Sequence, residues 1–190
     1  CTGVASSDFV GRAREALEAK EKVFQLYFTG CSGDVTVGKY NDGADAAREG
    51  LAARLLAGME ASAAATKLEP IGGSIRWRTA SLPLAPRTDK GYAEADRKAR
   101  LDNPAGEPGS RVYGGAMALA FARRSARPLL VRGLAIGPVD MLFLPGEPML
   151  EFQRFAQAAS PSRFVAVAGY CDCGPGYICT DAAFTEGGYE

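Results

Sequence analysis

The sequence predicts a mixed α/β (α+β) fold, in which a layered mixed sheet is flanked by helices. Short apolar or alternating runs, typical of strands, are interspersed with longer segments whose apolar residues recur at helical spacing. Two of the expected strands also follow each other closely enough to form a hairpin, which a purely parallel sheet would not contain. The chain has 190 residues, 47% of them apolar, and shows no internal repeat or clean linker. We therefore expect a single domain with a buried core.

The expected helices combine apolar stripes with residues that favour helix ends. The first starts near Phe9, where Ser7 and Asp8 can cap it, and the second is a long run rich in alanine and leucine. Pro148 suits the first turn of a later helix, because the N–H that proline lacks has no partner there. The helices expected after the first cover residues 44–65, 92–101, 111–125, 148–159 and 180–187.

The expected strands differ in their pattern. Residues 23–28, VFQLYF, are apolar enough for a short buried strand. Residues 74–82 alternate, with Ile75 and Trp77 on one side and Arg76 and Arg78 on the other. The remaining strands are 129–136 and 141–144, which form the expected hairpin around Gly-Pro-Val-Asp, and the buried run 163–170.

Charge and composition exclude several classes of function. Lysine plus arginine and aspartate plus glutamate number 22 each, and no nucleic-acid-binding motif is present, so we expect no nucleic-acid partner. No apolar run reaches the roughly 18 residues of a membrane span, and the location of the protein stays open. The chain contains no histidine, a leading general base and zinc ligand. Either the chain is not an enzyme, or its histidines lie on other polypeptide.

Five cysteines leave at least one thiol without a disulfide partner in the chain. The spacing of Cys171 and Cys173 is too close for a typical disulfide and differs from the C-x₂-C spacing common at zinc sites, so structural thiols are expected. Cys1 allows a second interpretation. A cysteine at the start of a self-processed chain can act as nucleophile, with its own α-amino group as the base.

Three segments could hold chemistry as well as serve packing. GCSGDVT at 30–36 follows an expected strand, and its glycines let backbone N–H groups approach a ligand, although an ordinary turn has the same composition. In LPGEP at 144–148, Glu147 is either a helix N-cap or a metal ligand or general base. The third segment, 169–190, concentrates tyrosines, glycines and cysteines, and its aromatic residues are usually explained by packing.

Taken together and in order, these segments resemble the neutral/alkaline ceramidase family, in particular its bacterial ceramidase-like branch. The matching stretches are TGVASSDFVGRAREAL at 2–17, YFTGCSGDVT at 27–36, FLPGEPMLEF at 143–152 and FVAVAGYCDCGPGYICTDAAFTEGGYE at 164–190. The resemblance implies that residues 1–190 are the C-terminal portion of a larger catalytic domain, incomplete without an upstream segment.

The family resemblance implies a zinc-dependent hydrolase of linear amides. In that family, zinc is held by two histidines, a glutamate and a tyrosine. Matching the motifs assigns the glutamate to Glu147 and the tyrosine to Tyr189. Asp34 and Thr36 fall in the family's Gly-Asp-Val-Ser loop and become candidate catalytic residues, with threonine replacing the family serine. Val37 and Gly38 replace the proline and asparagine that follow in the family, which weakens the expectation of ceramide itself as substrate.

The expected partners follow from the same resemblance. An upstream segment or chain of the same precursor would supply the histidines, and the substrate would be an amide or lipid-amide; a homo-oligomer is also possible. Two alternatives stay open: a self-processed hydrolase that uses Cys1, and a non-catalytic member of the fold that binds a ligand.

Overall fold

The computed structural model describes residues 5–68, 70–124, 127–172 and 176–187. The chain forms two compact units: a helical unit of residues 1–29 and 34–72, and a sheet unit of residues 30–33 and 73–190. Helices and a mixed sheet are both present, which confirms the predicted α+β class. Within the described residues, no helix has the length and apolar character needed to cross a membrane.

The helical unit consists of α1 (Asp8–Glu21), the short 3₁₀ helix η1 (Gly38–Tyr40) and α2 (Asp45–Ala65). Helix α1 packs against α2 and buries Ala13 and Leu17. Its predicted cap is wrong in detail: Ser7 makes no side-chain cap, and the Asp8 carboxylate accepts a hydrogen bond from the Phe9 N–H. The first two predicted helices are thus confirmed, with their apolar stripes facing each other.

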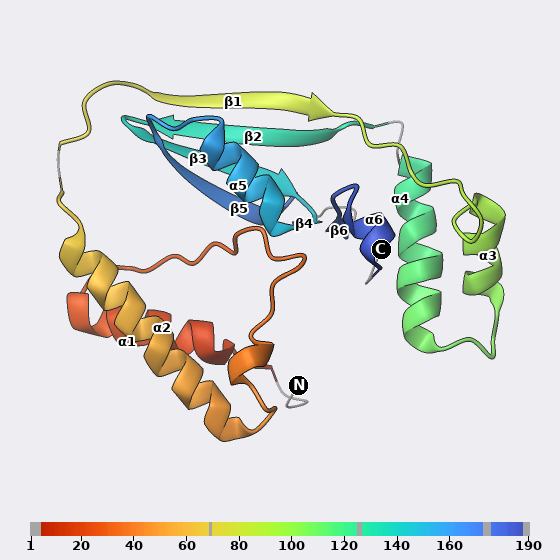
Figure 1. Cartoon of the computed structure of the whole chain (residues 1–190), viewed down its shortest axis with the longest axis horizontal. Coiled ribbons are helices and arrows are strands. Elements are labelled where there is room, and N and C mark those ends of the chain that lie inside the picture. Colours follow the sequence, from red (N-terminus) through yellow and green to blue (C-terminus); the bar gives the residue numbers. More distant parts are fainter. Residues whose placement is uncertain (1–4, 69, 125–126, 173–175, 188–190) are drawn as a thin grey trace. The chain divides into compact units, whose positions relative to one another are not determined.

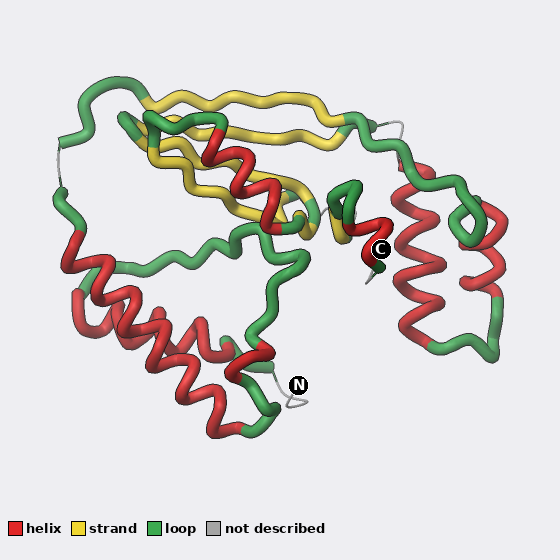
Figure 2. Tube along the Cα trace, viewed as in Figure 1, coloured by secondary structure: helices red, strands yellow, loops and turns green. Residues whose placement is uncertain are grey.

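The predicted buried strand at residues 23–28 is absent. The segment between α1 and η1 is irregular (Figure 2), and the apolar side chains in 23–28 are 53–71% exposed. A strand needs a neighbouring strand to pair its backbone groups, and none of the described strands pairs with this segment. Apolar composition alone therefore indicated a strand where the described chain provides no partner.

The sheet unit is built on a four-stranded mixed sheet (Figure 1). Its strands are β1 (Ile75–Leu82), β2 (Leu129–Ile136), β3 (Val139–Pro145) and β5 (Phe164–Cys171), in the order β1-β2-β3-β5. The β1–β2 and β2–β3 pairs are antiparallel and β3–β5 is parallel. The predicted hairpin is confirmed, with a connection of only two residues, Gly137 and Pro138, between β2 and β3.

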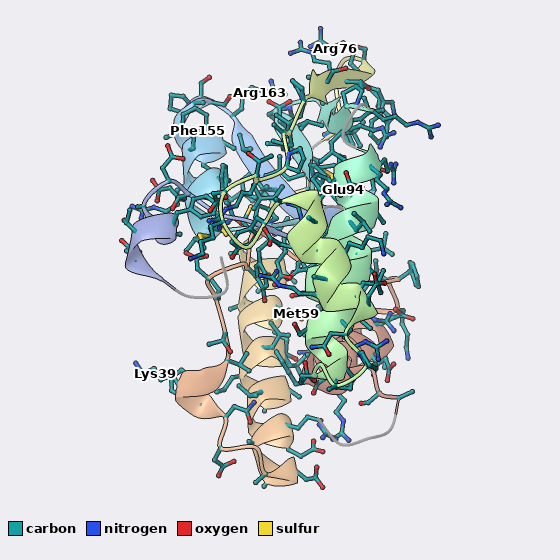
Figure 3. The ribbon with its side chains drawn as sticks, turned by 90° about the vertical axis from the view of Figure 1, so that its right-hand side faces the viewer. Lys39, Met59, Arg76, Glu94, Phe155 and Arg163 are labelled. Atoms are coloured by element: carbon teal, nitrogen blue, oxygen red, sulfur yellow. The ribbon has the colours of Figure 1, made fainter. Side chains whose placement is uncertain are left out.

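Helix α5 (Leu150–Ala158) crosses from β3 to the parallel strand β5 and packs against β5 (Figure 1). The Gln157 side chain donates a hydrogen bond to the Val165 carbonyl at 3.3 Å, and Val165 is buried. Phe155, labelled in Figure 3, lies on the outer side of this helix and is 74% exposed. One side of α5 therefore covers β5 and the other is open.

The opposite face of the sheet, which we call the Trp77 face, is mainly apolar and strongly exposed at one end. The strand register places side chains of all four strands on it, and the Trp77 and Phe143 rings stack with centroids 5.8 Å apart. Three of its residues are strongly exposed: Ile75 at 64%, Trp77 at 62% and Phe164 at 69%. The Trp77 face comprises Ile75, Trp77, Thr79, Arg132, Leu134, Ile136, Val139, Met141, Phe143, Phe164, Ala166 and Ala168.

Three further helices of the sheet unit pack against one another: α3 (Glu94–Asp102), the π-helical segment η2 (Ser110–Met117) and α4 (Ala118–Arg124). The single turn α6 (Ala183–Glu186) follows β6. The predicted helix at 111–125 is confirmed, although its first half is π-helical. Ser125 itself lies outside the described residues.

An ion pair joins the β2–β3 hairpin to the start of β5, and we expect it to make stability depend on acidic pH. The Arg163 guanidinium contacts both Asp140 carboxylate oxygens, one of them at 3.0 Å, and donates to the Gly137 carbonyl at 2.8 Å. Hydrogen bonding to Arg163 holds the pKa of Asp140 below its usual value. Its stabilisation is therefore complete above the unfolded pKa near 3.9 and is lost as the pH falls through the lower folded value.

The measurement is the free energy of unfolding between pH 2 and pH 7, for the wild type, Asp140→Asn, Arg163→Met and the double variant. All three variants should be less stable than the wild type at pH 7 and should lose less stability on acidification. A wild-type acid profile in Asp140→Asn would exclude this pair as the source.

Candidate functional site

The backbone around Glu147 is held by strand pairing at the end of the sheet. Strand β3 ends at Pro145, Gly146 turns the chain with a φ of 71°, and Glu147–Pro148 form the short strand β4. Strand β4 pairs in parallel with β6 (Tyr177–Ile178), and the Glu147 N–H donates to the Gly176 carbonyl at 2.7 Å. Pro145 and Pro148 are fully buried. These contacts fix the position from which the half-buried Glu147 side chain projects.

The N-cap interpretation of Glu147 is wrong. Helix α5 begins at Leu150 with Met149 as its N-cap residue, so Glu147 lies before the helix and belongs to a strand. Pro148 likewise lies in β4 and not in the first helical turn. Because the carboxylate is not needed to cap the helix, it is available for another role.

The glycine-rich loop approaches β4 closely. The Gly33 N–H donates to the Pro148 carbonyl at 3.0 Å, and a Cβ at residue 33 would lie 2.8 Å from the Glu147 carbonyl oxygen. The preceding Cys31 N–H donates to the Gln153 side chain of α5 at 3.3 Å. Gly33 therefore packs closely against the backbone that carries Glu147, and its N–H, which was expected to approach a ligand, is bonded to Pro148.

Tyr170, which the sequence analysis treated as a packing residue, lies beside Glu147. Its hydroxyl is 2.9 Å from the Ser32 Oγ. Partial burial raises the pKa of Tyr170 and the nearby Glu147 carboxylate raises it further, while the bond to Ser32 acts in the opposite direction. Tyr170 is 46% exposed, so packing does not account for its position.

A second tyrosine is in register with Glu147. Tyr177 of β6 is the pairing partner of Glu147 in β4, and paired residues of neighbouring strands project to the same side. The electrostatic effect of Tyr177 also raises the pKa of Tyr170, which indicates that the two phenols are near each other. Sequence reasoning missed Ser32, Tyr170 and Tyr177 as site residues. The available signal was the density of tyrosine and glycine directly after a core strand.

The other candidate residues belong to the helical unit or lie outside the described residues. Asp34 and Thr36 belong to the helical unit and are exposed. Cys1 and Tyr189 lie outside the described residues. Their proposed roles stay predictions.

The cluster around Glu147 offers two of the donor types that can bind zinc. Carboxylate oxygen is a common zinc ligand, and a phenol oxygen in register beside it offers a second donor. Within the residues that the structure describes, no group of three or more histidine, cysteine, aspartate or glutamate side chains is gathered, and the whole chain lacks histidine. The described residues therefore do not form a complete zinc site.

Comparison with solved structures identifies the fold. The chain superposes on neutral ceramidase from Pseudomonas aeruginosa with a TM-score of 0.62 and 17% identity, over 98% of its own length. A ceramidase complexed with C2 gives a TM-score of 0.64, again with 17% identity and 98% coverage. The chain has a ceramidase-like fold. It spans 37% and 39% of the two ceramidase chains, so more than half of each has no counterpart in it. No family model matches the sequence, and no curated protein does either.

Proposed function

We propose that this chain is part of a zinc-dependent hydrolase of linear amides, with an amide or lipid-amide substrate. The observation that carries the proposal is the ceramidase-like fold over 98% of the chain, with the Glu147 carboxylate in the short strand that follows β3. The proposed zinc site uses Glu147 and one tyrosine of this chain. Two histidines would come from an upstream segment or a separate chain of the same precursor.

The chemistry divides between the metal and the protein. Bound zinc supplies Lewis acidity that polarises the amide carbonyl and activates water. Glu147 would hold the metal through its carboxylate, from a backbone fixed by the pairing of β4 with β6 and by the Gly33–Pro148 hydrogen bond. Thr36 and Asp34, on the loop that follows Gly33, are the proposed groups for orienting the substrate.

The Trp77 face supports the proposed partner polypeptide. A sheet buries its apolar faces against other layers, and on this sheet α5 packs on one side while the Trp77 face is strongly exposed at one end. The two ceramidase structures contain more than twice the length of this chain, which is polypeptide enough for a further layer. We propose that the histidine-bearing part of the precursor covers the Trp77 face.

The decisive test is metal analysis and amide hydrolysis of the native protein, purified with the polypeptide that carries the histidines. We expect about one zinc per site, hydrolysis of an N-acyl amide, and loss of hydrolysis after chelation that added zinc restores. Native protein that contains no zinc and hydrolyses no amide would favour the non-catalytic alternative.

Substitution of tyrosines should identify the one that binds zinc. The family resemblance points to Tyr189, whereas the strand register places Tyr177 beside Glu147. We expect Tyr177→Phe to weaken zinc binding by more than about tenfold. Removing a residue that only orients a metal ligand already weakens binding by about tenfold or more, and removing the ligand itself should weaken it further. Tyr189→Phe, measured in parallel by chelator competition, tests the assignment from the family resemblance. Unchanged affinity in Tyr177→Phe with loss in Tyr189→Phe would support Tyr189.

A further inference from the structure

We propose that Ser32 and Tyr170 form a hydrogen-bond chain that positions the Glu147 carboxylate for the metal. In this assignment Tyr170 is a positioning residue that does not itself bind zinc. The inference rests on the proposed function, because it takes Glu147 to be a zinc ligand. The juxtaposition that carries it is the Ser32–Tyr170 hydroxyl pair, 2.9 Å apart, whose neighbouring backbone is hydrogen-bonded to Gly146 and Pro148 on the two sides of Glu147.

The number of protons available decides which group donates each hydrogen bond between Ser32, Tyr170 and Glu147. A metal-binding Glu147 is ionised and can only accept hydrogen bonds, so the Tyr170 hydroxyl must donate to it. The phenol has one hydrogen, and the second bond to Tyr170 must therefore be donated by Ser32. One carboxylate oxygen is thereby held by Tyr170, and the other oxygen is left available for a cation.

The backbone around Ser32 and around Tyr170 is hydrogen-bonded to the elements that carry or adjoin Glu147. Ser32 lies between Cys31, whose N–H donates to Gln153 of α5, and Gly33, whose N–H donates to Pro148 of β4. The Tyr170 N–H donates to the Gly146 carbonyl at 2.7 Å, one residue before Glu147. The three side chains are thus set on backbone segments that are directly hydrogen-bonded to one another or to the same short strand.

Tyr170 adopts this position at a conformational cost. Its φ is 58°, in the left-handed region that disfavours residues with a Cβ. Two residues later Asp172 has a φ of 55° and pairs with Arg132 of β2. Strained residues that are held by their surroundings concentrate at functional sites. This conformation occurs at the end of β5, where the Tyr170 phenol meets Ser32.

The test measures zinc affinity in the native protein by competition with a chelator of known affinity. Tyr170→Phe removes only the hydroxyl, and we expect zinc binding to weaken by about 10–100-fold, the usual effect of losing a group that orients a ligand. Ser32→Ala should weaken it less, because the Tyr170–Glu147 bond remains. In the double variant the two effects should not add, since Ser32 acts through Tyr170.

Control variants separate positioning from folding and from the proposed function. Tyr113→Phe, at a tyrosine that is 70% exposed, should leave zinc affinity unchanged. Thermal unfolding of the metal-free protein should be nearly the same for Tyr170→Phe and the wild type, whereas a purely structural role would lower the unfolding temperature in the absence of zinc.

Three outcomes are distinguishable. Zinc binding that is weakened in Tyr170→Phe and lost in Glu147→Gln supports both the inference and the proposed function. Zinc binding that is lost in Glu147→Gln but unchanged in Tyr170→Phe and Ser32→Ala overturns the inference alone. A wild-type protein that binds no zinc overturns both.

Discussion

Replacing Glu147 with glutamine is expected to abolish zinc binding and amide hydrolysis while leaving the fold intact. Glutamine keeps the size of the side chain and can still hydrogen-bond with Tyr170, but it removes the negative charge that holds a divalent cation. We expect zinc affinity to fall by more than about 100-fold, because removing a residue that only orients a metal ligand already lowers metal affinity by about 10–100-fold. Zinc content and the rate of hydrolysis of an N-acyl amide measure the effect.

Glu151→Gln provides the matched control. Glu151 lies four residues later in the first turn of α5, and its exposed carboxylate pairs with Arg154. Surface pairs of this kind contribute about 0–1 kcal/mol, so zinc binding and hydrolysis should stay at wild-type values. If Glu147→Gln retained full zinc and activity, Glu147 would not be a ligand and the proposed site would have to be abandoned.

Replacing Gly33 with alanine is expected to have the largest effect on stability. The new Cβ would lie 2.8 Å from the Glu147 carbonyl oxygen and 3.2 Å from the Met149 nitrogen, and both are backbone atoms that cannot rotate away. Either the loop moves and loses the Gly33–Pro148 hydrogen bond, or β4 shifts. Overpacking of this kind costs about 1–3 kcal/mol of unfolding free energy. Denaturant unfolding of the native protein measures it.

Gly58→Ala is the matched control for the same chemical change. Gly58 lies inside α2, and a Cβ there meets no atom within 4 Å. Alanine is favoured over glycine within a helix by roughly 0.5–1 kcal/mol, so this variant should be more stable than the wild type. The two substitutions should therefore shift stability in opposite directions. A Gly33→Ala protein as stable as the wild type would show that β4 and the loop are not in close contact.

Most helices and strands were predictable because their patterns are local. The long helix α2 follows from its alanine and leucine content, and β1 follows from the alternation that places Trp77 and Arg76 on opposite faces. Residues 23–28 show the limit of this reasoning. Their apolar run is typical of a strand, but a strand forms only where a partner strand is present. The sequence of the segment does not show whether such a partner exists.

The candidate site was predictable only in part. Glu147 stands out in the sequence because it follows a strand and Pro-Gly, whereas Tyr170 and Tyr177 look like packing aromatics. Strand β6, whose pairing brings Tyr177 beside Glu147, contains only two residues and has no sequence pattern of its own. The positive φ of Tyr170, which turns its phenol toward Ser32, also has no signature, because tyrosine rarely adopts that conformation.

By itself, the sequence determined the α+β class and the β2–β3 hairpin, because periodicity and turn residues are properties of neighbouring residues, whereas the choice of Glu147 came from the family resemblance. Only the tertiary structure decided that Glu147 lies in a short strand, that Gly33 supports this strand, and that Tyr170, with its partner Ser32, and Tyr177 lie near the carboxylate. The pairs that meet are 23 (Glu147–Tyr170) to 138 (Ser32–Tyr170) positions apart in the sequence. Contacts over such separations depend on how strands pair and loops close, which no local pattern specifies.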